Sequence, residues 1–176
     1  MNFVETPLKG AFIIEPERLE DDRGFFARTW CKREFEAHGL NPNMVQCNVS
    51  FNRVRGTLRG MHYQAPPFEE AKLVRCTMGA IYDVLIDLRR GSLTFKQYFA
   101  VEISSRNFLM AYIPEGFAHG FLTLENNTEV FYQMSEFYAP DHARGVRWYD
   151  PTFGIEWPAE VKVISERDRT YPDFKK

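Results

Sequence analysis

Apolar and polar residues alternate with a period of two along most of this chain, and this pattern restricts the structures that it can form. It is clearest from Phe95 to Ile103, where the odd-numbered residues would share one face of a strand. The same alternation occurs at residues 81–88, 109–113 and 129–134. Because successive side chains of a strand point to opposite faces, the pattern predicts many short β-strands.

Helical signal is confined to two short segments. Residues 32–38 precede Gly39, a typical helix stop, and Ser165 could begin a short helix near the end of the chain. Neither a repeat nor a linker divides the 176 residues, so we expect one domain over residues 1–176. Ten prolines and eleven glycines among the short strands favour an all-β jelly roll or a related double-sheet barrel, which can enclose a ligand cavity.

Composition argues against several classes of function. A net charge of -2 predicts neither a nucleic-acid-binding stripe nor a membrane-seeking surface. The three cysteines, Cys31, Cys47 and Cys76, lack CxxC spacing, which argues against a disulfide framework and a zinc site and favours a reducing compartment. Since neither a signal peptide nor an apolar run of membrane-spanning length is present, we expect a cytoplasmic protein.

The segment Arg59-Gly60-Met61-His62-Tyr63-Gln64 combines a fixed cation with an imidazole. Histidine titrates nearest to neutral pH, so His62 would be a suitable general base if another group oriented it, although a histidine taken alone is more often structural. Arg59 and His62 would point to opposite faces of a regular strand. A bulge or bend is therefore needed if both serve one site.

Three other candidates each have a structural alternative. Lys72 could be a surface lysine or a cation that stabilises enolate charge. Tyr132 could be a core aromatic residue or a proton donor. Asp168 follows Ser165 at the spacing of a helix start, so it could contribute to capping.

Further polar candidates occur in turns and strands. Gln46, Asn48 and Ser50 form one wholly polar strand face, which ordinary solvent exposure would also explain. His119 follows a Pro-Glu-Gly turn and lies between aromatic residues at the start of a strand. Arg23 could be a turn residue or a phosphate ligand.

Together these segments make the pattern specific. The motifs are Asp22-Arg23-Gly24-Phe25-Phe26, Gln46-x-Asn48-x-Ser50, Arg59 to Gln64, Lys72-Leu73-Val74, Pro114 to Phe121, Asp150-Pro151 and Gly154-Ile155-x-Trp157-Pro158. In this order the chain closely resembles the dTDP-4-dehydrorhamnose 3,5-epimerase family. The resemblance implies a cupin-type jelly-roll (double-stranded β-helix) homodimer with short peripheral helices. It implies action on a nucleotide-linked 4-keto-6-deoxy-hexose, converting dTDP-4-dehydro-6-deoxy-glucose to dTDP-4-dehydro-rhamnose in dTDP-rhamnose biosynthesis.

The resemblance also assigns roles to the matching positions. His62 would be the base, Asp168 the carboxylate that orients it, and Tyr132 the acid that returns a proton to the opposite face. Lys72, with Arg59 and His119 nearby, would stabilise the enolate. The remaining substrate-binding residues implied are Arg23, Phe26, Gln46, Asn48, Tyr138 and Arg167, part of the set coming from the partner subunit.

No metal and no organic cofactor is expected. Many cupins hold a transition metal through a His-x-His motif and a further histidine, but here the first motif reads His62-Tyr63-Gln64. The chain has four histidines in all. A three-histidine metal site is therefore improbable, and we expect a metal-free cavity.

Three positions depart from the family pattern, so the identities of the substrate's nucleobase and of its sugar stay open. Arg28 and Ala143 stand where family members commonly carry Glu, and Arg167 stands where Lys is usual. Two alternatives keep the fold: a C3-only epimerase or a 3,4-ketoisomerase acting on a related sugar nucleotide, and a non-catalytic cupin that only binds a sugar nucleotide. Tyr132 favours inversion, since removing and returning a proton on opposite faces requires two groups.

Overall fold

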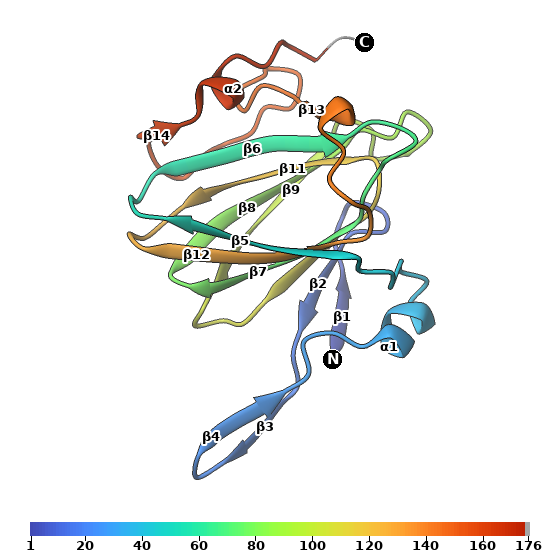
Figure 1. Ribbon diagram of the computed structural model, residues 1–176, viewed down its shortest axis with the longest axis vertical. Coiled ribbons are helices and arrows are strands. Elements are labelled where there is room, and N and C mark those ends of the chain that lie inside the picture. Colours follow the sequence, from blue (N-terminus) through green and yellow to red (C-terminus); the bar gives the residue numbers. More distant parts are fainter. Residues whose placement is uncertain (175–176) are drawn as a thin grey trace.

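Two β-sheets face each other in the computed structural model, which describes residues 1–174 (Figure 1). The first sheet has the order β1 (Asn2–Glu5), β2 (Phe12–Glu15), β10 (Met110–Ile113), β7 (Lys72–Met78), β12 (Thr128–Met134) and β5 (Gln46–Asn52). The second has the order β13 (Ala143–Gly145), β6 (Thr57–Gln64), β11 (Phe117–Thr123), β8 (Ala80–Asp87) and β9 (Tyr98–Ser104). A short strand, β14 (Val163–Ile164), runs parallel to β6, whereas the pairs within each sheet order are antiparallel.

The main core lies between the two sheets. Ile81 and Leu85 of β8 pack there with Val74 of β7 and Val130 of β12, and all four are fully buried. These residues share the interior face because a strand repeats every two residues. The predicted all-β jelly roll is confirmed, and its two-sheet arrangement leaves room at one edge for a cavity.

Part of the outer face of each sheet is also covered, which explains why β8 and β11 of the second sheet are almost continuously buried. The helix α1 (Lys32–Ala37) places Phe35 against Tyr112 of the first sheet. The C-terminal segment lies over the second sheet, where Val146 and Phe153 pack on Val84. Strands covered on both faces lose the clean alternation of apolar and polar residues.

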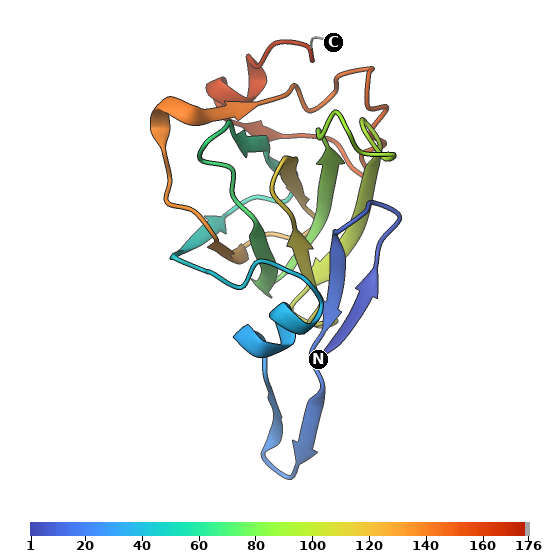
Figure 2. The ribbon, with the colours of Figure 1, turned by 90° about the vertical axis from the view of Figure 1, so that its right-hand side faces the viewer.

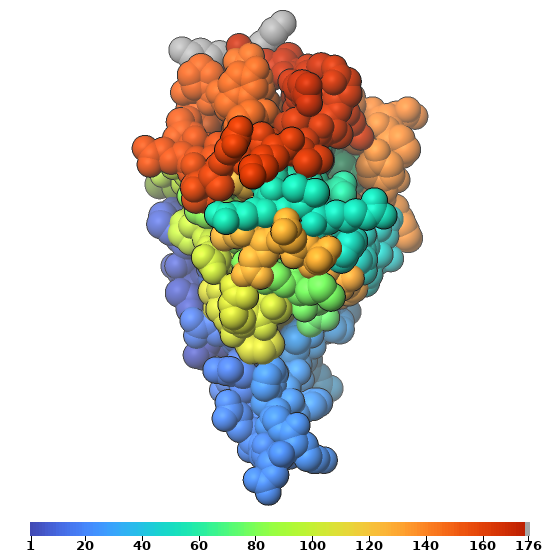
Figure 3. Space-filling model, turned by 90° about the vertical axis from the view of Figure 1, so that its left-hand side faces the viewer, coloured from blue at the N-terminus to red at the C-terminus, as the bar shows by residue number. Residues whose placement is uncertain are grey.

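A hairpin of β3 (Arg18–Asp21) and β4 (Gly24–Ala27) extends away from the two sheets (Figures 1 and 2). Figure 3 shows this N-terminal part, in blue, as the narrow end of the molecule. Three large apolar side chains of the hairpin are exposed: Leu19, Phe25 and Phe26. Leu19 and Phe26 lie opposite each other in the register of the hairpin, and exposed apolar side chains paired in this way are typical of an interaction surface.

The predicted short helices are present. The first spans Lys32–Ala37, and Gly39 follows it with a φ of 69°. The second, α2 (Glu166–Arg169), begins after Ser165, whose hydroxyl accepts a hydrogen bond from the Asp168 backbone N–H. A turn of 3-10 helix, η1 (Pro140–His142), precedes β13.

The strand predicted from residue 95 begins later, at Tyr98. Lys96 has a φ of 69°, and its backbone N–H donates to the carbonyl of Asp87. The buried Asp87 carboxylate also accepts hydrogen bonds from Arg89 and Thr94. The segment between β8 and β9 therefore folds around this carboxylate instead of extending as a strand.

Candidate active site

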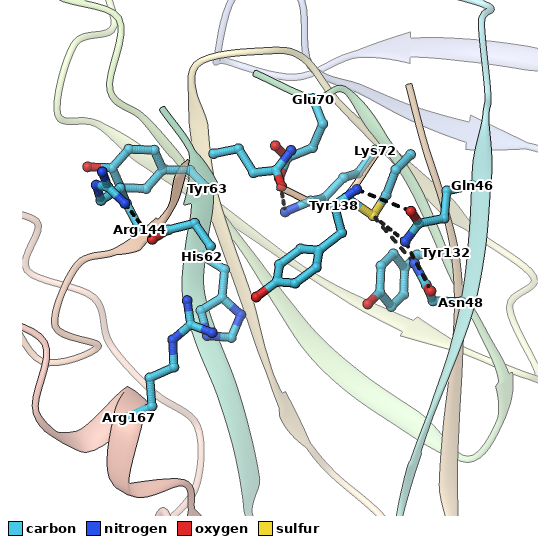
Figure 4. A pocket seen from close by; sticks show the side chains of 13 residues that line it. Gln46, Asn48, His62, Tyr63, Glu70, Lys72, Tyr132, Tyr138, Arg144 and Arg167 are labelled. Carbon is cyan, nitrogen blue, oxygen red and sulfur yellow. Dashed lines mark hydrogen bonds and ion pairs between the residues drawn. The ribbon is translucent and has the colours of Figure 1, made fainter. Parts of the chain in front are cut away.

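A cavity opens between the sheets near the β5 edge (Figure 4). One part has a volume of about 330 Å³, and an adjoining part of about 300 Å³ shares His62, Lys72 and Tyr132 with it. His62 comes from β6 in the second sheet, whereas Tyr132 comes from β12 in the first. A ligand in this cavity would thus meet the imidazole and the phenol from different walls.

His62 is held by Asp168, as the sequence predicts for a base and its orienting carboxylate. The His62 Nε2 lies 2.7 Å from the Asp168 Oδ1. Burial raises the pKa of Asp168, but hydrogen bonding and charge attraction to His62 outweigh it and lower the pKa overall. A carboxylate that stays ionised next to the ring favours the imidazolium and thereby strengthens the base.

The predicted bulge occurs in β6 at Gly60. In the pairing with β11, His62 lies opposite His119 and Arg59 lies opposite Phe121, so β6 has one more residue than β11 in this interval. Arg59 and His62 consequently line the same part of the cavity. The Gly60 N–H donates to the Asp168 Oδ2 over 3.1 Å, so one carboxylate holds both the bulge and the imidazole.

Lys72 is not a surface residue, so the structural alternative for it was wrong. It is 8% exposed, and its Nζ lies 2.9 Å from the Oε1 of Glu70, itself 7% exposed. The Glu70 Oε2 has no hydrogen-bond partner among the described residues. Sequence analysis missed Glu70, because a Glu-Glu pair before a strand is indistinguishable from ordinary surface charge.

A second histidine and carboxylate pair lies on the two strands that follow β6 in the second sheet, with His119 on β11 opposite His62 and Asp83 on β8. The His119 Nε2 is 2.7 Å from the Oδ1 of Asp83, and Asp83 is fully buried on the interior face of β8. Sequence analysis missed Asp83 as well. Its one available signal was its place, with Asp87, as one of two acidic residues within the apolar run of residues 81–88, since a buried carboxylate requires a partner.

Tyr132 faces the cavity while its ring also packs on the main core. Burial raises the pKa of its phenol; the Arg59 cation opposes this shift, whereas Glu70 and Tyr138 add to it. The phenol therefore keeps its proton over a wide pH range. That property suits a residue that donates a proton.

The polar face of β5 points into the cavity, so ordinary solvent exposure does not explain it. Gln46 and Asn48 line the first part of the cavity, and Ser50 lines the second. The apolar face of the same strand is the exposed one, with Val49 at 59% and Phe51 at 47%. This inverted arrangement places amide groups where a ligand would be.

The outer end of the cavity carries aromatic and cationic side chains. Tyr138 is 50% exposed there, and Arg167 lies nearby. The pKa of Arg167 is raised, mainly by a hydrogen bond to Tyr138. Of the three departures from the family pattern, Arg167 and Ala143 both line this end.

Two of the predicted site residues lie elsewhere in this chain. Arg23 pairs with Asp21 in the turn of the β3–β4 hairpin, and Phe26 is 69% exposed on β4. Neither lines the cavity described above. Arg28, the third departure from the family pattern, forms an ion pair with Glu34 of α1 over 3.1 Å.

The charges of the cavity differ between its two ends. At the inner end, His62, Lys72 and His119 each have a carboxylate partner, and Arg59 donates a hydrogen bond to the Asn52 side chain. At the outer end, Arg144 and Arg167 have no ion-pair partner among the described residues. An anionic ligand group would therefore be attracted to the outer end.

Chemically, the arrangement suits proton transfer next to a carbonyl. A base and an acid line different walls, and cationic donors between them could stabilise an oxyanion. Within residues 1–174, no three His, Cys, Asp or Glu side chains cluster to hold a metal ion. Across the same residues, no helix has the length and apolar character needed to span a membrane.

Comparison with known proteins points to one family. The family model described as dTDP-4-dehydrorhamnose 3,5-epimerase matches residues 5–176. A protein of that name from Methanothermobacter thermautotrophicus is 43% identical, over 98% of this chain and 94% of the relative. The crystal structure of the Bacillus anthracis epimerase, with TDP and PPi bound, is 41% identical with a TM-score of 0.95, covering 98% of this chain and 99% of that one. A Legionella pneumophila epimerase in complex with dTDP-4-keto-L-rhamnose is 35% identical with a TM-score of 0.90, over 97% and 90% of the two chains.

Proposed function

The chain belongs to the dTDP-4-dehydrorhamnose 3,5-epimerase family, and from this we propose that it inverts C3 and C5 of dTDP-4-dehydro-6-deoxy-glucose. The product is dTDP-4-dehydro-rhamnose, a precursor in dTDP-rhamnose biosynthesis, and the enzyme is an isomerase that needs no cofactor. The observation that carries this proposal is the pair formed by His62 and Asp168 facing the same cavity as Tyr132 on the other sheet.

His62 begins each inversion by removing a proton from the carbon next to the C4 ketone. The electrons of the C–H bond move to the C4 oxygen, which becomes an enolate oxyanion. Lys72, Arg59 and His119 line the cavity as donors for that oxygen. Preorganised donors of this kind stabilise developing charge because they need no reorganisation during the reaction.

Tyr132 completes the inversion by donating its proton to the opposite face of the same carbon. The enolate electrons form the new C–H bond, and the ketone is restored. His62 is left with an extra proton and Tyr132 without one, so both must exchange with solvent before the next inversion. The epimerised carbon therefore carries a hydrogen from solvent.

The nucleotide and its phosphates occupy the outer end of the cavity. Gln46 and Asn48 provide amide groups, Tyr138 provides an aromatic surface, and Arg167 provides a cation. The attraction of an anion to the unpaired arginines supports this orientation of the ligand. The relative from Bacillus anthracis, whose crystal contains TDP and PPi, supports a nucleotide of the same class.

The working form is a homodimer in the cytoplasm. We assign Arg23 and Phe26 to the cavity of the partner subunit, because the hairpin presents them away from their own sheets. The exposed apolar face of β5 provides a surface for the same association.

Solvent exchange tests the proposal directly. Incubation with dTDP-4-dehydro-6-deoxy-glucose in deuterated water should place deuterium at both C3 and C5, measured by NMR and mass spectrometry. Deuterium at C3 alone would identify a C3-only epimerase. Absence of deuterium at both carbons would contradict the proposed reaction.

Substitution of the base separates catalysis from binding. His62→Asn should retain dTDP binding and lose exchange by about 10²–10⁴-fold, the usual contribution of a general base. His38→Asn is the matched control, because His38 is exposed on the other side of the first sheet, stacked on Phe3. Full exchange by His62→Asn would remove this histidine from the mechanism and favour another base.

A further inference from the structure

Gln64 is a buried polar residue that the proposed chemistry does not use. It is the last residue of β6 and follows His62 by two positions. It lines the cavity and is only 4% exposed. A buried amide must have its hydrogen bonds satisfied, so the partners of Gln64 indicate what it does.

Three backbone groups satisfy the Gln64 amide. Its Nε2 donates to the carbonyl of Phe68 over 2.7 Å and to the carbonyl of Phe137 over 3.2 Å. Its Oε1 accepts from the N–H of Ala139 over 2.7 Å. The orientation of the amide is fixed by these partners, since a carbonyl can only accept and a backbone N–H can only donate.

Two of these partners stand immediately before and after Tyr138. The N–H of Tyr138 itself donates to the Gln46 Oε1 over 3.1 Å. Side-chain amides from β6 and β5 thus hold the backbone of three successive residues, although the Phe137 and Tyr138 side chains are both exposed. This segment connects β12 of the first sheet to η1 and would otherwise be an exposed loop.

We propose that Gln64 is a positioning residue for nucleoside binding, acting by fixing the backbone on both sides of Tyr138. The inference rests on the proposed function, in which the Tyr138 ring packs on the base of the nucleotide. A surface that is fixed before the ligand arrives loses less conformational entropy on binding. Gln64 therefore links β6, the strand that carries the proposed catalytic base His62, to the loop that holds the nucleotide.

Two variants of Gln64 test this role. Gln64→Glu keeps the shape but replaces the donor group with an oxygen that faces the Phe68 and Phe137 carbonyls. Gln64→Met keeps the length and removes all three hydrogen bonds. We expect each variant to weaken dTDP binding, measured by calorimetry, by about tenfold or more, since hydrogen bonds of about 1 kcal/mol each are lost. Gln133→Glu is the matched control, because its neighbour Tyr132 faces the cavity and strand alternation turns Gln133 the other way.

A double-mutant cycle with Tyr138→Ala distinguishes positioning from general damage. If Gln64 acts through Tyr138, Gln64→Glu should weaken dTDP binding by less than about twofold in the Tyr138→Ala background. The 1-phosphate of the 4-keto sugar, which has no nucleoside, should react with similar KM and kcat in wild type and Gln64→Glu. A full effect of Gln64→Glu without Tyr138, or unchanged dTDP binding by both Gln64 variants, would overturn the inference.

Amide hydrogen exchange tests the positioning without any ligand or variant. In the free wild-type protein, the amides of Tyr138 and Ala139 should exchange slowly, although the Tyr138 side chain is exposed. Rapid exchange of both would contradict the inference even if a Gln64 variant failed to fold. Wild-type protein that protects these amides but does not bind dTDP would instead contradict the proposed function.

Discussion

At the scale of single residues, two histidines and one lysine of the cavity each have their own buried carboxylate, whereas Arg59 donates a hydrogen bond to the Asn52 Oδ1. Asp168 holds His62, Asp83 holds His119, and Glu70 holds Lys72. A buried ammonium group is costly unless it is paired, so Glu70 stabilises Lys72, while Asp168 and Asp83 hold the imidazoles of His62 and His119 in place. These carboxylates position side chains that would contact the substrate. The carboxylates themselves need not contact its reacting carbons.

Removing the partner of Lys72 should therefore destabilise the fold. Glu70→Leu leaves the buried ammonium group unpaired, and we expect the free energy of unfolding to fall by about 3 kcal/mol. Chemical denaturation measures this change. Glu69→Leu at the neighbouring position, which is partly exposed and forms no ion pair within the described residues, should shift the value by less than about 0.5 kcal/mol. Equal effects would show that the ion pair does not stabilise the protein.

Asp87 should make the protein sensitive to acid. Burial raises the pKa of Asp87, but hydrogen bonds from Arg89, Ser92 and Thr94 outweigh it and bring the pKa to about 2, below the ordinary value of 3.8. Its contribution to stability is therefore complete above about pH 4 and is lost as the pH falls towards 2. Asp87→Asn should lower stability at pH 7 and flatten this acid-dependent loss, as measured by thermal unfolding between pH 2 and pH 7. A parallel pH dependence in both proteins would contradict the prediction.

At the scale of elements, β6 contributes most to the candidate site. Its bulge brings Arg59 and His62 to the same cavity, and its last residue, Gln64, holds the loop that carries Tyr138. The bulge needs glycine, because Gly60 has a φ of 143° and a Cβ there would lie 2.6 Å from the Gly120 Cα. One strand thus serves both the proposed chemistry and the proposed binding of the nucleotide.

Gly60→Ala should disrupt this element. The methyl group would meet the β11 backbone, and alanine rarely adopts this φ, so we expect a loss of about 2 kcal/mol or more in unfolding free energy. The rate of exchange of the substrate hydrogens should also fall in this variant, because the bulge positions His62. Gly91→Ala is the matched control, since no atom lies within 4 Å of a Cβ at that position. Wild-type exchange and stability in Gly60→Ala would show that the bulge tolerates a side chain.

At the scale of the whole molecule, the candidate site of a single chain lacks part of its predicted residues. Arg23 and Phe26 are exposed on the β3–β4 hairpin, and Figures 1 to 3 show that this hairpin extends from the sheets. The outer face of β5 is also apolar and exposed. A twofold association that buries these surfaces would let each hairpin contribute to the site of the other subunit.

Subunit mixing tests this exchange of residues. Arg23→Ala and His62→Asn should each have little activity alone. The refolded mixture should regain about a quarter of wild-type activity, because about half of its dimers would be mixed and each mixed dimer would have one site with both native residues. The measurement is activity after unfolding and refolding the two variants together. If Arg23 served its own chain, every site would carry one substitution and no activity would return.

The sequence by itself predicted most of the strands, the two short helices and many residues of the candidate site, although it missed Glu70 and Asp83. Period-two alternation predicted the strands, and Gly39 and Ser165 marked the ends of the two helices. The ordered motifs identified the family, and the opposite parity of Arg59 and His62 required the bulge. These features are readable because they depend on residues close together in the chain.

Only the tertiary structure decided which distant residues became partners. Asp83 and His119 are 36 positions apart and meet because β8 and β11 are neighbours. Gln64 reaches Ala139 over 75 positions, and nothing in the local sequence indicates that contact. The polar face of β5 likewise turned inward because the second sheet lies opposite it. The physical reason is that burial and pairing depend on which strands pack together, whereas propensity and periodicity describe each strand alone.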